Sequence, residues 1–219
     1  MLLQNSFIYF AFQSAFMDKK YQEDIAHIHT MMERSSRFIS LSGLSGVGAG
    51  IVALIAAGLA YYWMQEQGIL YMDNRHFNDS GLLSKLIITG LAALATALFS
   101  GIFFTLKKSR RQQQPVWNAL TRRLLLSLAL PLVAGGLFCI ALMMQGYFVF
   151  VAPATLVFYG LALVNAGKYT FKDIEFLGIG ELILGLAGMF FTGYGLLFWA
   201  AGFGLLHIVY GILMHLKYH

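Results

Sequence analysis

Long apolar runs dominate the chain, and polar residues gather in the segments between them. Six runs contain few charged positions, at 43–64, 86–106, 124–144, 147–167, 174–192 and 195–216. A membrane-spanning helix needs roughly 20 apolar residues, because each adds about 1.5 Å across a hydrocarbon core of about 30 Å. Transmembrane β-strands would be half as long and would alternate apolar and polar positions. The pattern therefore predicts an all-α polytopic membrane protein with six transmembrane helices.

Basic residues predict the orientation of these helices, because cytoplasmic loops retain an excess of Lys and Arg. Every Lys and Arg except Arg75 and Lys85 falls on one side of the predicted topology. We therefore expect both termini in the cytoplasm, an external loop at 65–85 and an internal loop at 107–123. The turns at 145–146 and 193–194 are so short that the runs on either side must form antiparallel hairpins. The expected location is the bacterial cytoplasmic (inner) membrane.

Two segments precede the six-helix domain at 43–219. Residues 1–16 are uncharged and lack the basic start and cleavage site of a signal peptide. We interpret them as an over-extended start or as a short segment lying in the membrane. Within 17–42, apolar residues recur at helical spacing, which predicts an amphipathic cytoplasmic helix. This helix either lies on the inner surface or docks a partner or a second subunit.

Composition excludes several classes of protein. Of 219 residues, 58% are hydrophobic and 11% are charged, against about 25% charged in soluble domains. A soluble domain of this size cannot bury so much apolar surface, so the whole chain is neither a soluble enzyme nor a nucleic-acid-binding domain. The single cysteine, Cys139, allows neither an internal disulfide nor a multi-thiolate metal site. We expect no cofactor, no metal and no catalytic residue.

The basic run at 107–123 contains no acidic residue. A nucleic-acid-binding patch would have this composition, but the bias toward positive cytoplasmic loops explains it without a further assumption. Basic residues near a membrane surface attract anionic lipid headgroups by about 1 kcal/mol each. We therefore expect the bilayer and its anionic headgroups as the partners of this loop, and no nucleic acid.

Small residues recur every three or four positions in the first two runs. Gly46 and Gly50 lie in the first run, and Ala93, Ala97 and Gly101 lie in the second. Such spacing is typical of helices that approach closely within a bilayer.

One of these small residues also belongs to a motif. The stretch Gly43–Gly46 matches the GxSG serine motif of rhomboid intramembrane proteases, which would require Ser45 to meet a histidine such as His207. A nucleophile and its base must lie about 3 Å apart, whereas these two residues are predicted at different membrane depths. Close helix packing is therefore the favoured interpretation.

Ionisable residues inside membrane helices are rare and usually face the bundle interior or a pathway. Glu181 and His207 are the two such residues well inside the predicted helices, each thirteen positions from Tyr194 in the last turn. An antiparallel hairpin therefore places them at the same height, and we predict a hydrogen bond or ion pair between them. The pair either fixes helix register or relays protons or ions. Tyr159 and Asn165 lie in the same half of the bilayer and are weaker candidates.

The stretches MMERSSRFISLSGLSG and VAPATLVFYGLALVNAGKYT resemble a family of small bacterial six-helix inner-membrane proteins without assigned activity. The resemblance implies no catalytic or binding residue. Two functions remain open. The first is a non-enzymatic structural or regulatory membrane module that acts through partners, either a membrane or cytoplasmic protein or a second copy in a homodimer. The alternative is a small, proton-coupled transporter or channel that uses Glu181 and His207.

Overall fold

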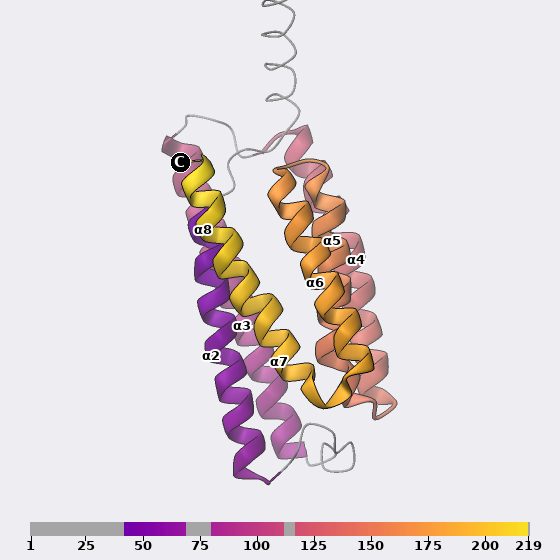
Figure 1. Cartoon of the computed structure of the whole chain (residues 1–219). Coiled ribbons are helices and arrows are strands. Elements are labelled where there is room, and N and C mark those ends of the chain that lie inside the picture. The colour runs from indigo at the N-terminus through magenta and orange to yellow at the C-terminus, as the bar shows by residue number, and fades with distance from the viewer. Residues whose placement is uncertain (1–41, 69–79, 112–116, 219) are drawn as a thin grey trace, which may run out of the picture. The chain divides into compact units, whose positions relative to one another are not determined.

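The computed structural model of the chain describes residues 42–68, 80–111 and 117–218, without the side chains of residues 80 and 111. The predicted segment at 1–16 and nearly all of the predicted helix at 17–42 lie outside the described residues. Within the described ranges every regular element is a helix (Figure 1). The predicted all-helical fold is confirmed to that extent.

The helices follow the six predicted runs. In chain order they are α2 (Gly43–Glu66), α3 (Ser80–Arg111), α4 (Ala119–Met144), η2 (Phe148–Phe150), α5 (Val151–Gly167), α6 (Lys172–Phe190), η3 (Thr192–Tyr194), α7 (Gly195–Trp199), the π-helical η4 (Ala200–Leu206) and α8 (His207–Tyr218). Among the described residues, five helical stretches are long and apolar enough to cross a membrane. They comprise α2, α3, α4, η2 with α5, and the continuous stretch from η3 to α8. The remaining long helix, α6, carries several charged residues, so its crossing stays a prediction.

The largest extensions beyond the predicted runs are in α3 and α4. Helix α3 continues to Arg111, because Lys and Arg are good helix formers and nothing breaks the helix at the end of the apolar run. Helix α4 starts at Ala119, where the Asn118 side chain caps it by accepting the Thr121 N–H at 2.8 Å. The segments between these helices are therefore 67–79 and 112–118, shorter than the predicted 65–85 and 107–123.

Helix α2 packs against α3 and α8, and α5 packs between α4 and α6 (Figure 1). Glycines allow the closest approaches. A Cβ on Gly50 would lie 2.6 Å from the Gly204 carbonyl oxygen, and a Cβ on Gly211 would lie 2.6 Å from the Val47 nitrogen. The predicted close contact of the first run is thus confirmed, with the last helix as its partner.

The equivalent prediction for the second run is wrong at Gly101. Within the described residues, a Cβ there would meet nothing within 4 Å beyond the backbone of its own helix turn. No residue in the most apolar part of α3 is buried, since this helix packs chiefly on α2, although Leu82 near its start is fully buried. Most of its large apolar side chains are exposed. The spacing of small residues therefore did not distinguish this helix from a buried one.

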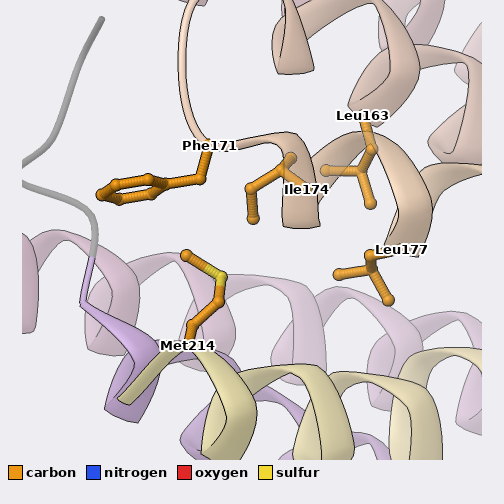
Figure 2. Close-up of a cluster of buried hydrophobic side chains, with 5 residues drawn as sticks. All are labelled: Leu163, Phe171, Ile174, Leu177 and Met214. Atoms are coloured by element: carbon orange, nitrogen blue, oxygen red, sulfur yellow. The ribbon is translucent and has the colours of Figure 1, made fainter. Parts of the chain in front are cut away.

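A cluster of buried apolar side chains joins α8 to the α5–α6 pair. Met214 points from α8 toward Phe171 and Ile174 at the start of α6, with Leu177 of α6 and Leu163 of α5 to one side (Figure 2). We call these five residues the α5–α6–α8 cluster. Because its members come from three helices, the cluster sets how the end of the chain packs on the start of α6.

A buried Glu–His–Tyr network as the candidate functional site

The structure brings Glu181 and His207 together. Oε1 of Glu181 lies 3.0 Å from Nδ1 of His207. Glu181 is 0% exposed and His207 is 5% exposed, so both side chains lie inside the bundle. The two side chains thus lie within the distance that the predicted pair requires. This proximity follows from the antiparallel arrangement of α6 and the last helix about the turn at η3.

Tyr159 of α5 extends this pair to a third helix. Its hydroxyl lies 2.9 Å from Nε2 of His207, so the two nitrogens of the imidazole face two different partners. The rings of Tyr159 and Phe203 lie on the imidazole, with centroid separations of 5.4 and 5.9 Å. The weaker candidate Tyr159 thus belongs to the network and fixes the orientation of the His207 ring.

A π-helical segment makes room for the carboxyl group. The segment η4 ends at Leu206, directly before His207, and Nδ1 of His207 also lies 3.2 Å from the Gly202 carbonyl oxygen. A Cβ on Gly202 would overlap Oε2 of Glu181 and also crowd Leu156. The π turn and the missing side chain at Gly202 together create the space that Glu181 occupies. Such turns are frequent at functional sites.

Hydrogen bonding in the network is incomplete. The Nδ1 hydrogen of His207 is directed at the Gly202 carbonyl oxygen, and neither oxygen of Glu181 accepts a well-directed hydrogen bond from the described residues. The short Oε1–Nδ1 distance therefore reflects an electrostatic contact more than a directed hydrogen bond. Buried polar atoms without partners are costly and uncommon. The carboxyl group is thus the least satisfied member of the network.

The α5–α6–α8 cluster adjoins the network, since Tyr159 packs against it. Beyond the cluster, at the start of α6, a second polar group joins the two helices. Lys217 lies 3.1 Å from Asp173, and the Tyr218 hydroxyl donates to Asp173 at 2.6 Å. Burial alone would raise the pKa of the Asp173 carboxyl, but hydrogen bonds from Tyr218 and Lys217 outweigh it and hold the pKa below its ordinary value.

Asn165 does not belong to this site. Its Nδ2 donates to the Ser127 carbonyl oxygen at 2.9 Å. That carbonyl precedes Pro131 by four positions in α4, where proline removes the N–H that would otherwise bond to it. Asn165 therefore compensates for a backbone bond that α4 lacks, which is a structural role.

Ser45 does not pair with His207 either. Its hydroxyl donates to the Ser42 carbonyl oxygen at 2.5 Å, within the first turn of α2. Both ring nitrogens of His207 face Tyr159, Gly202 and Glu181 instead. Among the described residues, no three His, Cys, Asp or Glu side chains lie close enough together to hold a metal ion.

Sequence reasoning missed the contribution of Gly202 and η4. The only signal was the concentration of glycine before His207, which also fits ordinary helix packing. Comparison of the chain with protein-family models, with curated proteins and with solved structures found no match.

Proposed function

We propose that this protein is a non-enzymatic membrane module that acts through protein partners. In this proposal six helices cross the bacterial inner membrane, with both termini in the cytoplasm. The observation that carries the proposal is the complete burial of Glu181 in packed side chains, with its partner His207 nearly as buried. A carboxyl group that solvent does not reach is better suited to fixing the register of helices than to binding a passing substrate.

The contacts of the network support this role. Tyr159, Glu181 and His207 come from α5, α6 and the start of α8, so one polar chain links three helices. Hydrogen bonds inside membrane bundles contribute about 0.6–2 kcal/mol each. Together with the apolar cluster, this network would give the second half of the chain a single arrangement, as a platform for a partner requires.

A specific observation favours the second candidate, a small proton-coupled transporter or channel. The Glu181 oxygens receive no directed hydrogen bond from the part of the chain that the structure describes. The carboxyl, imidazole and hydroxyl groups form a continuous chain of titratable groups beside a π turn. Intramembrane carboxyl and histidine chains of this kind carry protons in pumps and transporters.

Proton flux in liposomes separates the two functions. We expect purified protein, reconstituted with a pH-sensitive dye inside the vesicles, to leave the proton leak at the level of empty liposomes. The substitution Glu181→Gln keeps the size of the side chain and removes its titration, so it should leave the leak unchanged too. A flux that wild-type protein produces and Glu181→Gln abolishes, with folding intact, would establish the transporter instead.

A further inference from the structure

An apolar groove runs between α4 and α5, away from the Glu181 network. It has a volume of about 440 Å³, within the usual range of ligand sites. Its apolar lining comes from Leu130 and Pro131 of α4 and from Phe158, Leu161 and Val164 of α5. Leu130 and Leu161 are 73% and 41% exposed, so the groove opens on the outer face of this helix pair. In a bilayer that face meets lipid chains.

One end of the groove is polar, where Asn165 and Lys168 complete the lining. Lys168 directly follows the last residue of α5 and of its apolar stretch, Gly167. If α5 crosses a membrane, the Lys168 ammonium group would therefore lie at the boundary between hydrocarbon and headgroups. The ammonium lies 3.4 Å from Oδ1 of Asn165, whose Nδ2 is bound to the Ser127 carbonyl oxygen. The backbone defect at Pro131 thus indirectly orients a positive charge at the mouth of the groove.

We propose that this groove binds one anionic phospholipid, with its phosphate on Lys168 and an acyl chain along the apolar lining. Charge complementarity identifies the headgroup, because lysine binds phosphate as a point charge and basic pockets between membrane helices bind anionic headgroups. Length fits the chain, since Phe158 and Lys168 are separated by about 15 Å of helix at about 1.5 Å per residue. The groove is a lipid site separate from the basic run at 107–123.

Native mass spectrometry of the full chain in detergent tests the headgroup contact. We expect phosphatidylglycerol to bind more tightly than phosphatidylcholine of the same chain length. Lys168→Gln should weaken phosphatidylglycerol binding about fivefold, the effect of one basic residue near a headgroup. Lys172→Gln removes the same charge from an exposed position outside the groove lining and should leave binding unchanged. Equal losses in the two variants, or none in Lys168→Gln, would overturn the site.

A second pair of variants tests whether the acyl chain of the lipid lies in the groove. Leu161→Trp fills the groove and should displace phosphatidylglycerol. Ile183→Trp adds the same ring at an exposed position of α6 and should leave phosphatidylglycerol bound. Glycerol phosphate, which has the anionic group without a chain, should fail to compete with the lipid. Competition by glycerol phosphate, or retention of the lipid by Leu161→Trp, would contradict a groove that binds the chain.

Discussion

Burial of the Glu181 carboxyl depends on Gly202, the glycine that faces it. An ionisable group inside an apolar bundle costs free energy unless neighbouring groups compensate for the lost water. His207 supplies a nearby partner at 3.0 Å, but the carboxyl fits only because Gly202 has no side chain. Gly202 therefore determines the geometry of the network without contributing any polar side chain to it.

Substituting this glycine tests that dependence. In Gly202→Ala the new methyl group would overlap the Glu181 carboxyl and crowd Leu156, and both of these side chains are fully buried. We expect the free energy of unfolding to fall by about 1–3 kcal/mol, as overpacking of a tight interior usually costs. Denaturant unfolding in detergent micelles measures this loss.

Gly136→Ala is the matched control. A Cβ at Gly136 would meet no other atom within 4 Å, and this glycine also lies inside a helix, α4. Alanine is the better helix former by up to about 1 kcal/mol, so this variant should be as stable as the wild type or more so. If both variants behave alike, the space beside Glu181 is not what makes Gly202 necessary.

At the scale of elements, α6 and α8 are joined at successive levels. The deepest contact joins Glu181 to His207. The α5–α6–α8 cluster forms the next level. The outermost contact joins Asp173 at the start of α6 to Lys217 and Tyr218 at the end of α8. Phe171 stacks on Tyr218 with ring centroids 4.0 Å apart, next to the outermost contact. Polar contacts thus lie on both sides of an apolar layer, which ties the last helix to α6 in one register.

The outermost contact should make stability depend on pH. Because the folded pKa of Asp173 lies below its unfolded value, the contact stabilises the fold above the unfolded pKa, about 3.9. That stabilisation is lost as the pH falls through the folded pKa. We expect Asp173→Asn to lower the melting temperature at pH 7, and this difference from the wild type to shrink progressively below about pH 4.

Thermal melts of both proteins across this pH range provide the measurement. Glu175→Gln removes a carboxyl from the same helix turn and keeps the contacts of Asp173 with Lys217 and Tyr218, so it serves as the control. A difference between wild type and Asp173→Asn that stays constant down to pH 3 would mean that the charge of Asp173 does not stabilise the fold.

At the scale of the whole molecule, apolar run length predicted the helices and hairpin symmetry predicted the Glu181–His207 pair. Both depend on periodic geometry, which the sequence expresses directly. Asn165 was harder to place, because its partner is a backbone carbonyl exposed by Pro131 on another helix. Likewise, the exposure of α3 depends on how many other helices pack against it. The spacing of residues within one helix does not reveal how many neighbouring helices there are.

The distribution of Lys and Arg predicts how the helices are oriented in the membrane. In a Cys139→Ser background, Asn74→Cys lies in the segment between α2 and α3, and Gln113→Cys lies between α3 and α4. We expect an impermeant thiol reagent to label Asn74→Cys in intact cells and to label Gln113→Cys only after permeabilisation. The two sites flank one helix, so a reversed result would invert every other loop as well. Labelling of both sites in intact cells would instead mean that α3 does not cross the membrane, despite its length and apolar character.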